Sequence, residues 1–278
     1  MMQSRYLDPK NDLSFKKIFG EEKHKRIPID FLNAVYHLTG DRKITYLEFL
    51  NPIQPPKVAA RKESIVDVLV QDQRGSKYIV EMQVVKVEGF EKRAQYYAAK
   101  TYLAYFGKGK KYHDLKKVIF LAITDYLVFP KKERYKSDHL ILDNLSHEHD
   151  LKDFSFTFVE LPKFTKSLKE LKSIEDKWYY FLKHADESND IDEILADHPE
   201  IKEAYDVLDR YHWSEEELHY YEKLMMNEAD MHGTLEAAKN EGRNEEKYQI
   251  AKALLKQGLS PNQIAMATRL TLEDIESL

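Results

Sequence analysis

The sequence predicts an α/β fold in which a small mixed β-sheet is flanked by helices and followed by an all-helical C-terminal region. Two observations lead to this prediction. Segments rich in β-branched residues alternate with helical patterns as far as residue 161, and strand patterns largely stop beyond it. The chain has 278 residues, 42% of them hydrophobic, which is enough to bury a substantial core in about two domains.

The chain opens with two predicted helices. Apolar residues recur at mainly helical spacing over residues 11–20, and Gly20 closes that segment. A second apolar-rich helix is predicted over residues 29–38. Residues 51–57 contain three prolines and favour turns, so no helix continues through them.

Two strand patterns follow and predict a hairpin. Residues 64–70 and 77–85 are rich in β-branched side chains, and Asp72-Gln-Arg-Gly75 between them favours a tight turn. The remaining elements are predicted in chain order as a helix over 90–106, strands over 116–124 and 154–161, and helices over 173–185, 190–195, 199–210 and 214–257.

The last segment, residues 250–278, has the rhythm of a small helix-turn-helix, with helix starts at Ser260 and Thr271. A DNA-reading helix needs basic or amide side chains at its N-terminus, whereas the third helix here begins with acids. A packing or self-association module is therefore favoured over a DNA reader. We predict an α/β domain over residues 1–164, a helical extension with a long charged helix over 165–248, and a small helical module over 249–278.

Composition excludes several classes of protein. There is no cysteine, which excludes disulfide frameworks and thiolate metal sites, and no apolar run approaches the ~20 residues that span a bilayer. The N-terminus lacks an apolar stretch of signal-peptide length, so we expect a cytoplasmic protein without a membrane partner. The net charge of -5 combines a basic half, residues 1–130, with an acidic half, residues 131–278. Any polyanionic partner should meet the first half.

The residues with the clearest chemical potential lie on the predicted hairpin. Glu81 and Gln83 are two apart in a strand and project to one face, and Asp67 in the preceding strand can lie near Glu81. Two carboxylates about 5 Å apart repel by roughly 3 kcal/mol at an effective dielectric near 20, a cost that a bound Mg²⁺ or Mn²⁺ would remove. Asp12 of the first helix is a candidate third carboxylate. In the alternative, Asp67 pairs with a lysine and Glu81 faces solvent.

The helix over 90–106 carries a candidate DNA-binding face. Arg93, Tyr96, Tyr97 and Lys100 share a face, so the basic residues can contact phosphates while a tyrosine stacks nearby. In the alternative, the tyrosines pack on the sheet and the basic residues are solvated. Further candidates for phosphate contacts lie elsewhere: Lys16, Lys17, Lys108, Lys110 and Lys111.

Four segments together point to a family. They are Leu7-Asp-Pro-Lys-Asn-Asp-Leu-Ser-Phe-Lys-Lys-Ile-Phe-Gly20, Ile65-Val-Asp-Val-Leu-Val70, Ile79-Val-Glu-Met-Gln-Val84 and Phe90-Glu-Lys-Arg-Ala-Gln-Tyr-Tyr-Ala-Ala-Lys-Thr-Tyr102. In this order they resemble the Rpn family of recombination-promoting nucleases, also labelled transposases, within the PD-(D/E)XK nuclease superfamily. The resemblance covers about residues 6–130 and extends to the helical tail.

The resemblance implies a restriction-endonuclease-like core and a Mg²⁺-dependent DNA endonuclease, a hydrolase of phosphodiester bonds with a role in DNA recombination. It makes Asp67 and Glu81 metal ligands, with the Met82 carbonyl as a further ligand and Asp12 as a possible one; Mn²⁺ should substitute for Mg²⁺. Gln83 takes the place of the superfamily's lysine, and Val66 stands where its name implies proline. A homodimer would cut both DNA strands most easily.

Two other function classes stay open at this point. The first is a catalytically weak or inactive DNA-binding or regulatory protein that retains the nuclease fold, because Gln83 brings no positive charge to the site. The second is a protein-interaction scaffold built on the acidic helices. Metal binding that depends on Asp67 would distinguish the nuclease from both.

Overall fold

The structure, a computed structural model, describes residues 4–54, 64–104, 111–187 and 198–278. Lys108, Lys110 and the predicted helix over 190–195 lie outside these ranges. The chain divides into two compact units, residues 1–224 and 225–278. The three-part division made from the sequence stays a prediction.

The first unit contains a six-stranded mixed sheet with the order β1-β4-β5-β6-β8-β7. The β5–β6 and β6–β8 pairs are parallel and the other pairs are antiparallel. The strands of this sheet are β1 (Leu47–Phe49), β4 (Val68–Asp72), β5 (Lys77–Gln83), β6 (Val118–Thr124), β7 (Lys136–Leu140) and β8 (Phe154–Glu160). A separate two-stranded sheet is formed by β2 (Ile53–Gln54) and β3 (Ser64–Ile65).

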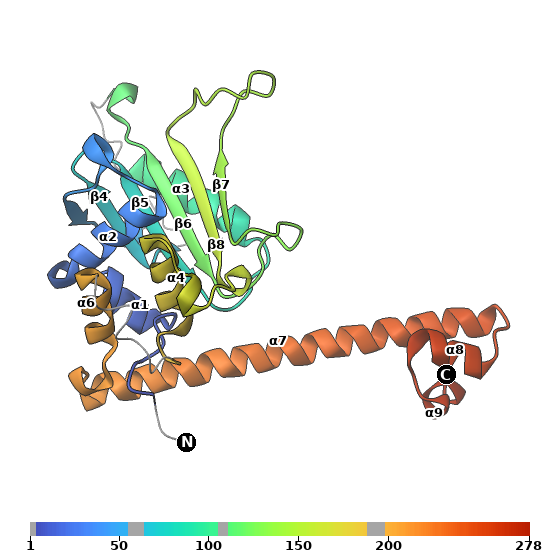
Figure 1. The fold of residues 1–278 in the computed structure, drawn as a ribbon. Coiled ribbons are helices and arrows are strands. Elements are labelled where there is room, and N and C mark those ends of the chain that lie inside the picture. The colour runs from blue at the N-terminus through green and yellow to red at the C-terminus, as the bar shows by residue number, and fades with distance from the viewer. Residues whose placement is uncertain (1–3, 55–63, 105–110, 188–197) are drawn as a thin grey trace. The chain divides into compact units, whose positions relative to one another are not determined.

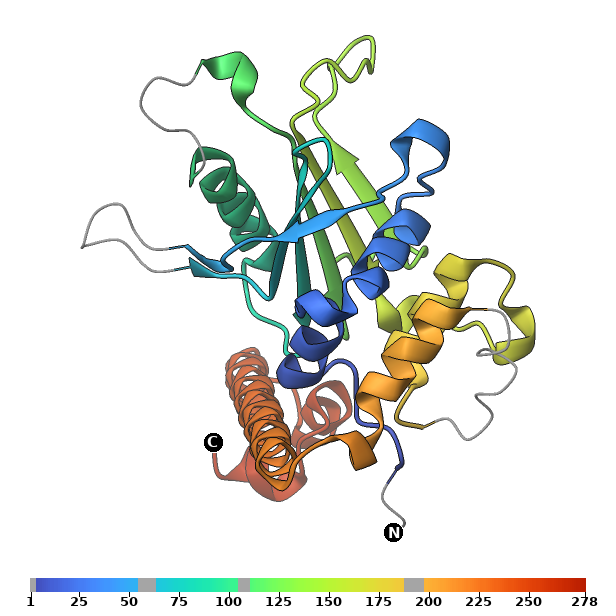
Figure 2. The ribbon, with the colours of Figure 1, turned by 90° about the vertical axis from the view of Figure 1, so that its left-hand side faces the viewer.

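Helices flank this sheet, which confirms the predicted fold class. The α-helices are α1 (Asp12–Phe19), α2 (Arg26–Val35), α3 (Phe90–Ala104), α4 (Ile174–His184), α6 (Pro199–Leu208), α7 (Glu215–Lys256), α8 (Pro261–Thr268) and α9 (Leu272–Glu276). Short 3-10 turns lie at Glu22–His24, Gly40–Arg42, Tyr112–Asp114, Leu161–Lys163, Leu168–Glu170 and Arg210–His212. Figures 1 and 2 show α3 on one face of the sheet and α1, α2, α4 and α6 on the side of the other face. In the described part of the chain, no helix is both long enough and apolar enough to span a bilayer.

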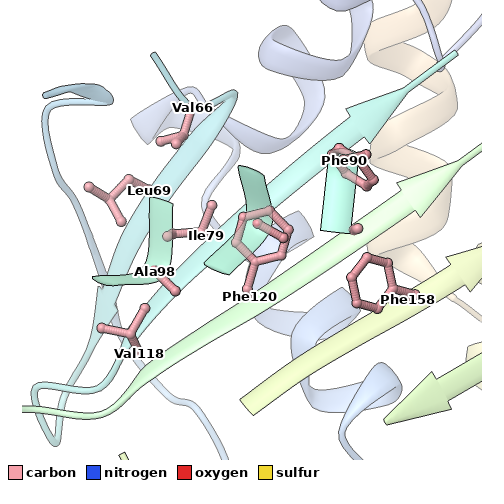
Figure 3. Packing of buried hydrophobic residues seen from close by; sticks show 10 residues of the cluster. Val66, Leu69, Ile79, Phe90, Ala98, Val118, Phe120 and Phe158 are labelled. Atoms are coloured by element: carbon pink, nitrogen blue, oxygen red, sulfur yellow. The ribbon is translucent and has the colours of Figure 1, made fainter. Parts of the chain in front are cut away.

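The layer between α3 and the sheet is a small apolar core (Figure 3). Ala94 and Ala98 of α3 are fully buried, and their small side chains let the helix lie close to Ile79, Val118 and Phe120 of the strands. This packing fixes α3 against β5 and β6, and β5 carries the predicted Glu81 and Gln83.

The opposite layer is built from aromatic side chains. Phe19, Phe31 and Trp178 pack with ring centroids 5.0–6.1 Å apart, and Trp178 donates its indole N–H to Asp30 over 2.8 Å. Such contacts between three helices bury large apolar surfaces and satisfy the indole donor. The Trp178 ring is therefore part of the core.

The turn between β4 and β5 explains why the hairpin forms where predicted. Gly75 has φ of +86°, a conformation that favours glycine, and the buried Asp72 carboxylate accepts hydrogen bonds from the backbone N–H groups of Arg74 and Ser76. Arg74 also forms an ion pair with Asp72 at 2.8 Å. This turn sets the register that pairs Val68 with Val80.

The structure corrects three expectations from the sequence, two about strands and one about a helix. The strand predicted continuously over 64–70 breaks at Val66 and Asp67, and its first part pairs with β2 in the small sheet. Strands β1 and β7 were not predicted. The sequence of β7, Lys136-Ser-Asp-His-Leu140, has no apolar run, and this strand owes its conformation to pairing with β8. The helix predicted over 29–38 runs over Arg26–Val35 instead.

The second unit has its own small core of Ala251, Ile264 and Ile275. Helices α8 and α9 begin with capping boxes at Ser260 and Thr271, as the sequence predicted. Helix α7 continues without a break through the charged residues 240–248.

Candidate active site

Asp67 and Glu81 meet where the β4–β5 ladder ends. In the hairpin register Asp67 is the next residue opposite Glu81, and its backbone N–H donates to Oε1 of Glu81 over 3.3 Å. In return, the backbone N–H of Met82 donates to Oδ2 of Asp67 over 2.9 Å. The Asp67 carboxylate thus accepts the Met82 N–H, which a continued ladder would pair with Val66, and the two hydrogen bonds hold the acids together at the break in the strand.

The Glu81 side chain is buried in the protein. Glu81 is only 2% exposed, so the alternative in which it faces solvent does not hold. Burial, and next the neighbouring Asp67 carboxylate, raise the pKa of Glu81 well above its usual range. Burial also raises the pKa of Asp67 to about 6, against the lowering effects of the Met82 N–H and of Lys16 and Arg93. The pair therefore carries an electrostatic cost that Lys16 and Arg93 offset only in part and that a bound cation would relieve.

The Gln83 side chain is held by hydrogen bonds to three atoms around it. Its amide Nε2 donates to Oε2 of Glu81 over 3.1 Å and to the carbonyl oxygen of Met82 over 2.8 Å. Its Oε1 accepts a hydrogen bond from Nη2 of Arg93. The predicted common face of Glu81 and Gln83 is therefore observed, with the Met82 carbonyl close to both.

Arg93 reaches the site from the first turns of α3. Its guanidinium lies 4.9 Å from the centroid of the Phe90 ring and 5.8 Å from that of Tyr97, and among the described residues its buried Nε has no hydrogen-bond partner. An unpartnered buried donor is costly, so this nitrogen is available to a ligand that enters the site.

The other predicted DNA-binding residues of α3 lie further from the acids. Tyr96 is 47% exposed, and Lys100 is half-buried about two turns beyond Arg93. Tyr97 packs against the α3 core, and its ring centroid is 6.1 Å from that of Tyr96. The placement of Lys108 is outside the described residues.

Helix α1 places an ion pair next to the acids. Nζ of Lys16 lies 2.6 Å from Oδ1 of Asp12, and the charge of Lys16 acts on both Asp67 and Glu81. Within the described part of the chain, no three acidic or histidine side chains are grouped to hold a metal ion. Asp12 is thus bound to Lys16 here and is not joined to the pair.

Sequence reasoning missed one neighbour of the site, Asp125. Its N–H donates to the carbonyl of Gln83 over 2.9 Å, and its carboxylate pairs with Lys10 at 3.3 Å. An acid directly after a buried parallel strand was the available signal, because the carboxyl ends of parallel strands meet at one edge of a sheet.

The donors present fit a hard divalent cation. Two buried carboxyl groups and the Met82 carbonyl offer only oxygen atoms, the ligands that Mg²⁺ and Mn²⁺ prefer. Burial raises the pKa of both carboxyl groups although the charges of Lys16 and Arg93 act in the opposite direction, so a further positive charge would be favourable here.

Comparison with family models identifies one match. Residues 9–238, more than half of the chain, match the model of the PD-(D/E)XK nuclease family transposases. The matched range contains every residue of the site described above. Comparisons with curated proteins and with solved structures give no match.

Proposed function

We propose a function from one premise: the chain belongs to the PD-(D/E)XK nuclease family transposases. Membership supports a nuclease or transposase-like function, and the mixed sheet flanked by helices is consistent with a restriction-endonuclease-like fold. We propose that the protein is a Mg²⁺-dependent DNA endonuclease of the recombination-promoting type. The observation that supports this most is the buried pair of Asp67 and Glu81 around the Met82 peptide.

Asp67, Glu81 and the Met82 carbonyl would hold the ion, and Mn²⁺ should replace Mg²⁺. When bound, the ion would lower the pKa of a water molecule and neutralise charge on the phosphate. The Gln83 amide donates hydrogen bonds to two of the proposed metal ligands, the Glu81 carboxylate and the Met82 carbonyl. It would therefore lie close to a metal ion bound by them. We propose that Gln83 then orients the attacking water.

The reaction itself is a hydrolysis. The oxygen of water forms a bond to phosphorus, the bond from phosphorus to one sugar oxygen breaks, and that oxygen takes up a proton. Arg93 would bind a phosphate oxygen through its unpartnered Nε. Lys16 would meet the DNA near the acid pair, on which its charge acts. Lys100 and Tyr96 would contact the DNA backbone further out, and the same role for Lys108 rests on the sequence alone.

The test is cleavage of supercoiled plasmid by purified protein with Mg²⁺, with Mn²⁺ and with EDTA. We expect nicking that needs the metal and that falls at least about 100-fold in both Asp67→Asn and Glu81→Gln. Glu91→Gln is the matched control, since it removes one exposed carboxylate of α3 and leaves the pair intact. Breaks that persist in both site variants would reject the proposed site.

A second candidate follows from the neutral amide at position 83. A chain that keeps the fold but lacks a sufficient cationic group would bind DNA without cutting it. Salt-dependent DNA binding by a folded, Mn²⁺-binding wild type that makes no breaks would favour this DNA-binding or regulatory function. Absence of Mn²⁺ binding would reject the nuclease.

Two further parts of the proposal concern the whole protein. Cleavage of both strands of a duplex is simplest with two active sites, so we propose a homodimer, which sedimentation at micromolar concentration would test. We also propose a cytoplasmic location, which cell fractionation would test.

A further inference from the structure

Lys16 and Lys17 are neighbours on α1 but have different surroundings. Nζ of Lys17 pairs with Glu217 at 2.5 Å and lies 4.1 Å from the centroid of the Trp213 ring. Lys16, about 100° further round the helix, pairs with Asp12 at 2.6 Å and lies within electrostatic range of Asp67 and Glu81. Lys17 therefore ties α1 to Glu217 and Trp213, while Lys16 is paired with Asp12 and its charge acts on the candidate active site.

Arg93 and Lys16, two cations whose charges act on the acid pair, have different contacts. The charges of Arg93 and Lys16 act on both Asp67 and Glu81. Arg93 is engaged by Gln83 and is packed against two aromatic rings. Lys16 is held by one partly exposed carboxylate on its own helix, with 38% of its side chain exposed. Its compact ammonium group on a flexible stem can turn from Asp12 to a phosphate oxygen.

We infer that Lys16 is a catalytic residue that supplies, from α1, the positive charge that Gln83 cannot supply from β5. This inference rests on the proposed nuclease function. In it, Asp12 is a positioning residue that holds Lys16 beside the acid pair until DNA arrives. The ammonium group then binds a non-bridging oxygen of the scissile phosphate, and it stabilises the negative charge that grows there as water attacks.

A lysine that only grips the DNA backbone would behave differently. Its loss would weaken DNA binding and lower the salt dependence of binding by about one phosphate contact, with cleavage of saturated DNA unchanged. A group that stabilises the transition state affects the rate at saturation instead. The two roles are therefore separable by one set of measurements.

The experiment compares wild type, Lys16→Gln, Lys16→Arg and Lys92→Gln. Lys92 is exposed on α3 and provides the same change of charge away from the acids. The readouts are the single-turnover cleavage rate at saturating DNA and Mn²⁺, the Kd for DNA in Ca²⁺, and the affinity for Mn²⁺ without DNA. Circular dichroism checks that each variant is folded.

We expect Lys16→Gln to lose about 100-fold or more in saturating rate, with little change in DNA affinity. Lys16→Arg should recover part of that rate because it keeps the charge. Mn²⁺ should bind Lys16→Gln at least as tightly as wild type, since a repelling charge is gone, and Lys92→Gln should match wild type in every readout.

Two results would overturn the inference alone, with wild type active. One is a saturating rate of Lys16→Gln within tenfold of wild type, whatever its DNA affinity. The other is a loss of rate that accompanies a loss of Mn²⁺ affinity, which would make Lys16 a support of the metal site. A wild type that binds Mn²⁺ and DNA without cleavage would overturn the proposed function, and this inference with it.

Discussion

The backbone N–H of Asp67 donates to the carboxylate of Glu81 over 3.3 Å, across the point where the ladder between β4 and β5 stops. The same two side chains are acids with raised pKa values in a buried setting. Substitutions of these two acids should therefore change the stability of the protein as well as its activity.

Neutralising either acid should stabilise the protein in the absence of divalent metal. Burial opposes both charges, and we expect Asp67→Asn to raise the free energy of unfolding at pH 7.5 by about 1–3 kcal/mol. Glu81→Gln should change it in the same direction. Denaturant titration in EDTA measures this change.

The same variants should lose their response to metal. Saturating Mn²⁺ should raise the Tm of wild type and of the control Glu91→Gln, because a ligand that binds the folded state stabilises it. Asp67→Asn should show little shift. Equal shifts in wild type and Asp67→Asn would contradict a metal site on this pair.

Arg93→Lys should be a damaging substitution although it keeps the charge. The guanidinium donates to Gln83 while it packs over Phe90, and a lysine ammonium lacks the planar fork that makes both contacts at once. We expect the cleavage rate at saturating DNA to fall by about tenfold or more, with Lys92→Gln as the surface control. A rate for Arg93→Lys equal to that of wild type would show that the planar group has no such role.

Stability should depend on pH through Asp8. Burial raises the pKa of Asp8 to about 6 from 3.8, against the opposing charge of Lys10. The folded state therefore holds a proton that the unfolded state loses between these values, so the contribution of Asp8 to stability falls as pH rises from about 4 to about 6.

Asp8→Asn should remove that dependence. The difference in unfolding free energy between Asp8→Asn and wild type should shift in favour of the variant by up to about 3 kcal/mol from pH 4 to pH 6.5. Urea titrations at several pH values measure it. The other carboxyl groups titrate in both proteins and cancel in this comparison. A difference in unfolding free energy that does not change with pH would contradict the raised pKa of Asp8.

A substitution in the core of the second unit should destabilise that unit without affecting the first. Ile264 is fully buried between Ala251 and Ile275, so Ile264→Ala should cost about 2–4 kcal/mol locally. Hydrogen exchange should become faster over residues 261–276 and stay unchanged over β5. Met266→Ala, at an 86% exposed position of the same helix, is the control and should change neither region.

Local patterns determined much of the fold. The turn residues Asp72 and Gly75 fixed the hairpin, and the two-residue period of a strand put Glu81 and Gln83 on one face, as found. Caps such as Ser260 and Thr271 marked helix starts correctly. These features depend on neighbours within a few residues, so the sequence contains them directly.

Long-range pairing decided the rest. Nothing local in Lys136-Ser-Asp-His-Leu140 encodes a strand, and β7 exists because β8 offers it an edge. At the break in the strand, Glu81 accepts the Asp67 N–H and Asp67 accepts the Met82 N–H, contacts that only the pairing of the two strands brings about. The same holds for α1. The sequence does not distinguish Lys16 from Lys17, and only the packing of that helix places Lys17 against Trp213 and Lys16 within electrostatic range of the acid pair.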